Sequence, residues 1–258
     1  MEIRLDGRTA LITGGSKGLG LAMATRFAQS GAEVAMLARG AQALGEAERA
    51  IRAKAQTRVK GFACDVAKAD ELARTWKDVI AEFGKVDILI NNAGTSRTGP
   101  FEEITDAIWQ EDFDLKLFGA IRLARLALPD MKKRRWGRII NVLNVGAKAP
   151  RPGSAPTAVT RAAGLALTKI LSGEGAPHNV LVNAMLVGLI RSDQHVQRFK
   201  GENRDIEEGY RERGAPLPMG RFGEAEEFAN LACFLVSDAG SYVTGTAINV
   251  DGGMSPVV

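Results

Sequence analysis

The stretch Thr13-Gly14-Gly15-Ser16-Lys17-Gly18-Leu19-Gly20 lies between the apolar run Ala10-Leu11-Ile12 and a helix-like run that starts near Leu21. A glycine-rich turn between a strand and a helix lets the backbone approach a pyrophosphate, whose charge is stabilised at the helix N-terminus. A tight strand–helix connection that needs positive φ angles would also use glycines. The stretch therefore predicts a strand–turn–helix unit, and a phosphate site where further signals agree with it.

Strand-like apolar runs alternate with helix-length segments along the rest of the chain. Continuous apolar strands separated by helices are typical of a parallel sheet covered on both faces. We therefore expect an α/β, Rossmann-type doubly wound fold of about seven strands, with residues 1–258 in a single domain. The expected strands are residues 9–13, 34–38, 58–64, 86–90, 138–143, 180–186 and 247–250, and the expected helices include 19–29, 43–55, 69–83 and 224–236.

Residues 189–219 interrupt this alternation. The segment is polar and irregular, and it contains three glycines and two prolines, Gly201, Gly209, Gly214, Pro216 and Pro218. A long insertion in a compact domain is usually functional and often covers a site. We therefore expect residues 189–219 to form a substrate lid.

The composition excludes several classes of protein. The chain is 45% hydrophobic and 25% charged, with a net charge of +4, and no apolar run approaches the ~18 residues of a membrane span. The one basic cluster, residues 132–135, falls at the expected end of a helix, where cations complement the dipole. Cys64 and Cys233 lie far apart without the spacing of metal ligands, which is typical of buried thiols in a reducing compartment. We expect a cytoplasmic protein that binds no metal, membrane or nucleic acid.

Three further motifs occur in a telling order. Cys64-Asp65-Val66 ends the third expected strand, Asn91-Asn92-Ala93-Gly94 ends the fourth, and Arg221-Phe222-Gly223 leads on to Asp251-Gly252-Gly253 near the end of the chain. Together with the glycine-rich turn, they cover nearly the whole sequence. In this order and spacing the chain resembles the short-chain dehydrogenase/reductase family, in its 3-oxoacyl-ACP-reductase-like form.

This resemblance implies a nicotinamide dinucleotide cofactor and the residues that would hold it. They are Gly14, Ser16, Lys17, Gly18, Leu19, Gly20, Arg39, Asp65, Val66, Asn91, Ala93, Gly94, Arg161, Gly188 and Ser192. In family members that prefer NAD(H), an acid at the end of the second strand binds the ribose 2′-hydroxyl. Here Ala38 and Arg39 stand at that place and Lys17 adds a second cation, which favours the 2′-phosphate of NADP(H). NAD(H) remains an alternative if Arg39 is only a solvated residue at the start of a helix.

The resemblance also locates four catalytic slots. The family's asparagine, serine, tyrosine and lysine correspond to Lys116, Asn144, Thr157 and Arg161. A threonine hydroxyl is a very poor general acid, whereas Asn144 can still orient a carbonyl and Arg161 keeps a positive charge. The four slots therefore predict a non-standard active site.

Lys116 is the one titratable group among these four residues. A second cation nearby, Arg161, would lower the pKa of Lys116 and suit it to be a proton donor or an anion clamp. A helix lysine that extends its charge to solvent is the alternative. Other candidates for an acid are Tyr210 and His195 in the lid, whereas Tyr242 and His178 fall in segments that look structural.

Cations gather around the expected pocket, namely Lys116, Lys148, Arg151, Arg161 and Arg191. They suggest a small-molecule substrate that is anionic or rich in carbonyl groups. Three functions stay open because fold alone does not fix the reaction: an NADP(H)-dependent oxidoreductase, a non-redox isomerase or lyase, and a non-catalytic NADP(H)-binding subunit or sensor. The resemblance further implies a homo-oligomer, dimer or tetramer, formed through long helices at residues 104–134 and 154–175.

Overall fold

The protein is built around one parallel sheet of seven strands, seen here in a computed structural model that describes residues 3–258. The strand order β3-β2-β1-β4-β6-β8-β9 reverses direction between β1 and β4, as in doubly wound folds. This confirms the predicted fold class. The strands are β1 (Thr9–Thr13), β2 (Glu33–Ala38), β3 (Val59–Ala63), β4 (Ile88–Asn91), β6 (Gly137–Asn144), β8 (Val180–Val187) and β9 (Ala247–Val250).

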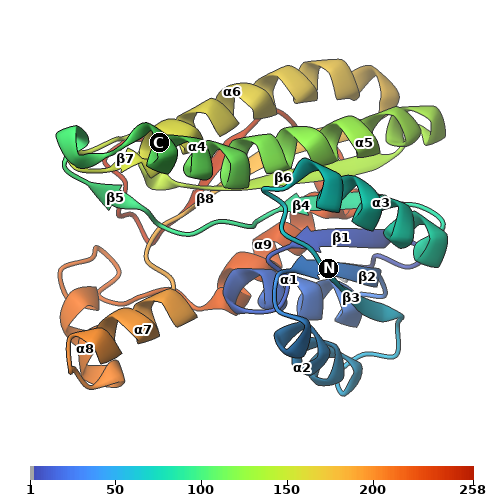
Figure 1. The fold of residues 1–258 in the computed structure, drawn as a ribbon. Coiled ribbons are helices and arrows are strands. Elements are labelled where there is room, and N and C mark those ends of the chain that lie inside the picture. Colours follow the sequence, from blue (N-terminus) through green and yellow to red (C-terminus); the bar gives the residue numbers. More distant parts are fainter. Residues whose placement is uncertain (1–2) are drawn as a thin grey trace.

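Helices cover both faces of this sheet (Figure 1). One face carries α1 (Gly18–Gln29), α2 (Ala41–Arg52) and α9 (Ala225–Val236), and the other carries α3 (Ala69–Phe83), α5 (Gly119–Arg134) and α6 (Thr157–Gly175). Each face buries its own hydrophobic cluster, because both sides of the central strands are apolar. Short helices are η1 (Phe101–Glu103), α4 (Asp106–Phe113), η2 (Asp114–Phe118), η3 (Val145–Ala147), η4 (Ala176–His178) and η5 (Asp238–Gly240).

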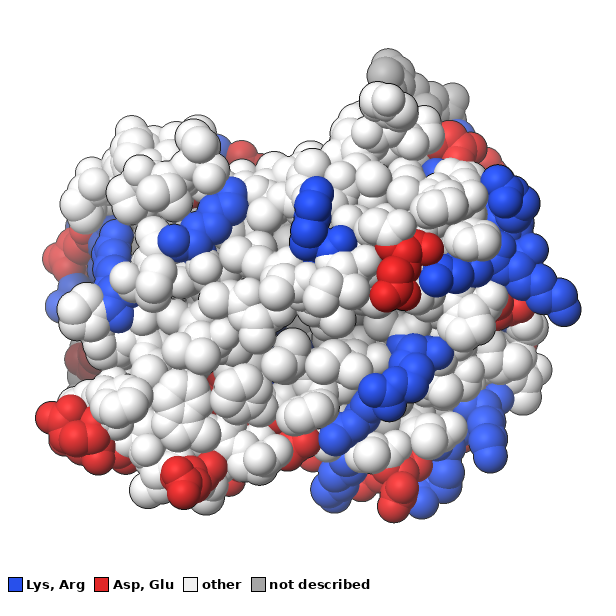
Figure 2. All heavy atoms as spheres, turned by 90° about the horizontal axis from the view of Figure 1, so that it is seen from above, with Lys and Arg blue, Asp and Glu red and all other residues white. Residues whose placement is uncertain are grey.

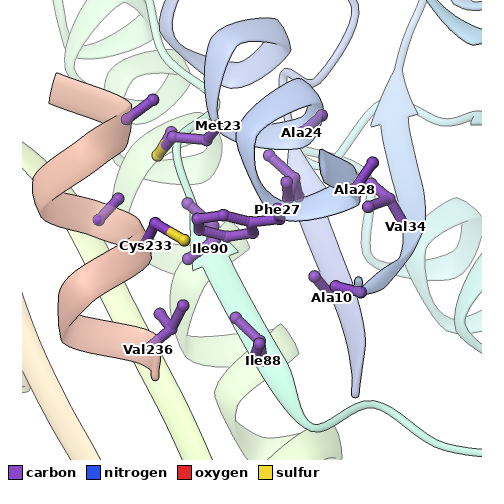
Figure 3. Close-up of a cluster of buried hydrophobic side chains, with 14 of the residues drawn as sticks. Ala10, Met23, Ala24, Phe27, Ala28, Val34, Ile88, Ile90, Cys233 and Val236 are labelled. Carbon is purple, nitrogen blue, oxygen red and sulfur yellow. The ribbon is translucent and has the colours of Figure 1, made fainter. Parts of the chain in front are cut away.

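Phe27 is at the centre of the cluster on the α1 side. Its ring points from α1 between the side chains of β4, including Ile90, and those of α9, including Cys233 (Figure 3). Phe27, Ile90 and Cys233 are all fully buried. The first helix is thereby fixed on the sheet next to the glycine-rich turn.

The glycines of that turn have separate structural roles. Gly14 and Gly18 adopt φ angles of 66° and 52°, which side chains disfavour. A Cβ atom on Gly20 would lie 2.1 Å from the carbonyl oxygen of Gly14. Only glycine at position 20 therefore lets α1 start this close to the end of β1.

Three details of the fold differ from the sequence prediction. The expected helix at residues 104–134 is divided into α4, a π-helical turn at η2, and α5. Two short strands, β5 (Thr98–Gly99) and β7 (Ala155–Pro156), pair antiparallel beside the site and were not expected. The second expected long helix therefore begins at Thr157, after β7, and not at residue 154.

The prediction that residues 189–219 are irregular was wrong. They contain α7 (Asp193–Gly201) and α8 (Ile206–Gly214), which lie apart from the other helices in Figure 1. Phe199, Tyr210 and Phe222 form a small aromatic core between them, with ring centroids 5.0 and 5.1 Å apart. Because each helix contributes one buried aromatic to this core, the polar composition of the segment hides its regular structure.

Replacing Phe27 by alanine tests the cluster between α1, β4 and α9. We expect a loss of about 3–5 kcal/mol in the free energy of unfolding, because the buried ring leaves a cavity. Chemical denaturation measures this loss. In the control variant Phe101→Ala the ring removed is 72% exposed, and we expect a change within about 0.5 kcal/mol. Equal losses in the two variants would contradict this description of the core.

Candidate active site

A cavity of about 530 Å³ lies at the carboxyl ends of β1, β4, β6 and β8. Parallel strands bring residues that are distant in the chain to this edge; Asn144 at the end of β6, for example, pairs with Val187 at the end of β8. The cavity is lined by many of the residues expected to hold a cofactor or to take part in catalysis: Gly14, Lys17, Gly18, Leu19, Ala93, Gly94, Asn144, Thr157, Arg161, Gly188 and Ser192.

Other expected site residues lie outside this lining. Asn91 is buried within the sheet, where its Nδ2 donates to Asn141 Oδ1 over 2.9 Å. Asp65 accepts a hydrogen bond from the Ala67 amide, and Arg39 is exposed just beyond β2. Ser16, Gly20, Val66 and Lys116 do not line the cavity either.

Arg161 reaches the cavity from α6. Its Nη1 donates to the Val142 carbonyl oxygen over 2.8 Å, and a Cβ atom on Gly94 would lie 2.4 Å from its Nη2. Glycine at position 94 therefore makes room for the guanidinium group. Burial lowers the pKa of Arg161 to about 10, so the side chain stays positively charged at neutral pH.

The Thr157 hydroxyl has all of its hydrogen-bonding capacity in use. Its Oγ1 donates to the Arg97 carbonyl oxygen over 2.7 Å and accepts from the Arg97 amide over 3.0 Å and from Lys116 Nζ over 2.7 Å. A hydroxyl has one proton and two lone pairs. Thr157 therefore ties the segment before β5 to α6 and holds the end of the Lys116 side chain.

Lys116 is buried and paired, not directed to solvent. It lies in the π-helical turn η2, and its ammonium group forms an ion pair with Asp112 one turn earlier, both side chains being almost fully buried. The second oxygen of Asp112 accepts from Thr160 Oγ1 over 2.6 Å. Burial lowers the pKa of Lys116 to about 8, and Arg161 and Arg97 act in the same direction against the opposing effect of Asp112.

Asp112 and Thr160 thus belong to the hydrogen-bonded cluster around Lys116, and neither was predicted from the sequence. The signal that could have found Asp112 is its spacing, because residues four apart on a helix are neighbours. Thr160 has a similar signal, since it lies three residues after Thr157 on the same helix.

Asn144 presents a polar atom at the cavity. Its Oδ1 is buried and makes no hydrogen bond within residues 3–258. A buried amide oxygen without a partner is costly. A hydrogen-bond donor on a bound molecule would satisfy it.

Residues 189–219 contribute to the cavity, and their two candidate acids, Tyr210 and His195, have different surroundings. Tyr210 is buried in the aromatic core, where its hydroxyl interacts with the backbone of Ser192. His195 lines the cavity and packs edge-on against Phe222, and burial lowers its pKa below 6.5. Burial therefore favours the neutral form of the ring. On α7, Asp193 lies 3.6 Å from Lys17 of the glycine-rich turn.

Most of the cations expected around the pocket do not face the cavity. Lys148 donates to the Ala247 carbonyl and to Asn249, and Arg191 pairs with Glu207 and Glu224. Arg151 is exposed. Of the five cations, only Arg161 belongs to the lining.

Residues 3–258 contain neither a candidate metal cluster nor a candidate membrane-spanning helix. No group of three or more histidine, cysteine, aspartate or glutamate side chains is placed to hold a metal ion. No helix in this range has the length and apolarity to cross a membrane.

A parallel sheet in this order, with a glycine cradle and a cavity at its carboxyl edge, defines the Rossmann-type dinucleotide-binding class. Comparison with known proteins narrows this class. Residues 14–255 match the family model described as enoyl-(acyl carrier protein) reductase. The chain belongs to the short-chain dehydrogenase/reductase family of oxidoreductases.

Similar proteins match over almost the full chain. A 3-oxoacyl-(acyl-carrier-protein) reductase FabG of Aquifex aeolicus is 33% identical over 254 residues, covering 98% of this chain and 100% of the relative. Dehydrogenase/reductase SDR family member 4 of Pongo abelii is 32% identical, covering 96% and 88%. The crystal structure of L-sorbose reductase from Gluconobacter frateurii, complexed with NADPH and L-sorbose, is 35% identical and covers 100% of both chains with a TM-score of 0.95.

The Asp112→Asn variant tests the buried ion pair. Lys116 then loses its counter-charge, and we expect a loss of about 3–5 kcal/mol in unfolding free energy at neutral pH. The pKa of Lys116 in the folded variant should fall below its wild-type value of about 8. A depressed lysine pKa means that the unfolded chain binds more protons, so stability rises with pH above that pKa. The difference in unfolding free energy between the wild type and Asp112→Asn should therefore become smaller as the pH rises toward 8.

Denaturant unfolding measured between pH 6 and pH 8.5 checks this expectation. Asp78→Asn, which removes an exposed carboxylate on α3, is the control, and its effect should be small throughout. A deficit in Asp112→Asn that stayed constant across this range would show that Lys116 does not respond to Asp112.

Proposed function

We propose that the protein is an NADP(H)-dependent oxidoreductase that reduces a carbonyl group or oxidises the corresponding hydroxyl. One observation carries the proposal: the glycine-rich turn and Asn144, Thr157 and Arg161 line the same cavity. A cofactor on the turn and a substrate beside Asn144 would then meet. The similarity to a reductase complexed with NADPH and L-sorbose, which covers all of both chains, supports this function.

The residues present fit a dinucleotide. Gly14 and Gly18 keep positive φ angles at the turn. Gly94 and Gly188 line the same cavity, where their lack of a side chain lets Arg161 and Asp251 pack closely against the backbone. Lys17 and the exposed Arg39 supply positive charge where the 2′-phosphate of NADP(H) would lie. NADP(H) is therefore the preferred cofactor, and NAD(H), which lacks that phosphate, should bind more weakly.

We further propose that the active site is non-standard, with Lys116, Asn144, Thr157 and Arg161 in place of the family's four catalytic residues. The cofactor, when bound, supplies or accepts the hydride. The Arg161 guanidinium stabilises negative charge that develops on the substrate oxygen, and the Asn144 amide orients the substrate. Lys116 is the titratable group of this set.

The lining suggests the kind of substrate. Five cations were expected around the pocket, and of these Arg161 alone lines the cavity. We therefore propose that the substrate is a small carbonyl compound with at most one anionic group. Neutral polar side chains, Thr95, Ser96 and Gln194, line the same space. These side chains can form hydrogen bonds with hydroxyl groups on the substrate.

The choice of NADP(H) predicts a specific loss of affinity. In Arg39→Ala and Lys17→Ala we expect the Kd for NADPH to rise about 10- to 100-fold in each variant, because a charge-assisted contact with the phosphate is lost. The Kd for NADH should change little. Fluorescence titration of the cofactor measures both constants. Arg49→Ala, which removes an exposed arginine further along α2, is the matched control; a parallel loss for NADH would contradict phosphate recognition.

A panel of carbonyl compounds, including ketoses, tests the reaction. We expect NADPH to be consumed in step with formation of the alcohol. Product formation without cofactor consumption would instead identify an isomerase or lyase. Binding of NADPH without turnover across the panel would identify a non-catalytic subunit or sensor.

We also propose that the protein forms a dimer or tetramer through α5 and α6. Figure 2 shows the molecule from the side on which α5 and α6 lie, and uncharged side chains dominate the centre of this face. On α6 the side chains of Val159 and Ile170 are 48% and 59% exposed. Exposed apolar patches of this kind commonly mark interfaces between proteins.

Light scattering tests this assembly. We expect the wild-type molar mass to be a multiple of 27.5 kDa, and Ile170→Arg to lower it because a charge would be buried in the interface. Ala50→Arg, at an exposed position on α2, should leave the mass unchanged. A monomeric wild-type protein would rule out the assembly.

A further inference from the structure

We propose that Lys116 and Thr157 form a proton path to the substrate oxygen, and that Asp112 is the residue that positions Lys116. The Thr157 hydroxyl passes its proton to the substrate and takes one from Lys116. This inference deepens the proposed function and rests on it.

The geometry separates the proton donor from the cavity by one side chain. Lys116 does not line the cavity, whereas Thr157 does. The Lys116 side chain is 1% exposed, and its Nζ lies 2.7 Å from Thr157 Oγ1. Within residues 3–258 Lys116 donates hydrogen bonds to Asp112 and Thr157, and of these two residues only Thr157 lines the cavity. A proton leaving Lys116 toward a bound substrate therefore has to pass through the Thr157 hydroxyl.

Asp112 fixes the start of this path. One of its oxygens holds the Lys116 ammonium group, and the other accepts from Thr160 over 2.6 Å. Thr160 also contacts the Pro156 carbonyl oxygen over 3.2 Å. Because both oxygens are engaged, the carboxylate cannot turn away, and Lys116 keeps its direction toward Thr157.

The proton transfers balance in the direction of reduction. Hydride addition to the carbonyl carbon places an electron pair on the substrate oxygen. The Thr157 O–H bond breaks and its proton forms the new O–H bond of the alcohol. One Lys116 N–H bond breaks and its proton restores the Thr157 hydroxyl, which leaves Lys116 as a neutral amine. During transfer the Thr157 hydrogen leaves the Arg97 carbonyl oxygen, its acceptor at rest.

The charges around Lys116 suit a donor that is reloaded near neutral pH. Asp112 from α4 favours the ammonium form, and Arg161 from α6 and Arg97 from the segment before β5 oppose it. Burial outweighs Asp112, and the pKa of Lys116 falls to about 8. The neutral amine can thus recover a proton through Thr157 once the product has left the cavity.

Four variants test the path in the full-length protein loaded with NADPH and a carbonyl compound that the wild type reduces. We expect Thr157→Val and Lys116→Met to lower kcat about 100-fold or more, because general acid catalysis contributes about 10²–10⁴-fold. Thr157→Ser keeps the hydroxyl and should recover most of the lost turnover. In the wild type, kcat should decline as the pH rises above the pKa of Lys116. In Asp112→Asn this decline should begin at a lower pH. Lys133→Met, an exposed lysine on α5, is the control.

A second measurement does not depend on turnover. NMR of ¹³C-labelled lysine side chains, with the Lys116 signal assigned from Lys116→Met, follows its titration in the protein without cofactor. We expect a pKa near 8 in the wild type and lower values in Asp112→Asn and Thr157→Val, since each loses a group that stabilises the ammonium form. Retained kcat in Thr157→Val, or an unshifted Lys116 titration in Asp112→Asn, would overturn the path while the proposed function stood. A wild type inert toward every carbonyl tested would overturn both.

Discussion

The parallel alignment of the central strands is the constraint on which the site depends. Because β1, β4, β6 and β8 run in the same direction, their carboxyl ends meet at one edge of the sheet. Gly14, Asn144 and Gly188 therefore line the same cavity. The first helix completes this arrangement. It approaches the end of β1 so closely that a side chain at position 20 would collide with the Gly14 carbonyl.

The fold was largely predictable because its signals are local. Apolar strands and the glycine-rich turn are short-range patterns, and they predicted the seven-stranded sheet correctly. Helices α7 and α8 were not predictable in the same way, because they are stabilised by Phe199, Tyr210 and Phe222, which meet only in the folded chain. The division of the long helix at η2 likewise has no simple signal in residues 114–118.

The candidate site shows the same contrast. The spacing of the motifs predicted that Asn144, Thr157 and Arg161 lie close together, and the three residues line one cavity. The spacing could not predict which groups each side chain contacts. Lys148 and Arg191 were grouped with the pocket by sequence, and the structure pairs both elsewhere. Asp112 lies four residues before Lys116, but the sequence does not show that both side chains are buried, and their ion pair was overlooked for this reason.

The separate aromatic core between α7 and α8 has a consequence for how such a protein diversifies. Phe199, Tyr210 and Phe222 hold α7 and α8 together without using the main sheet. Gln194, on the cavity side of α7, is exposed and stands outside that core. Mutations at such positions can accumulate with little cost in folding, so the side chains at this edge of the cavity can change between lineages while the scaffold is preserved.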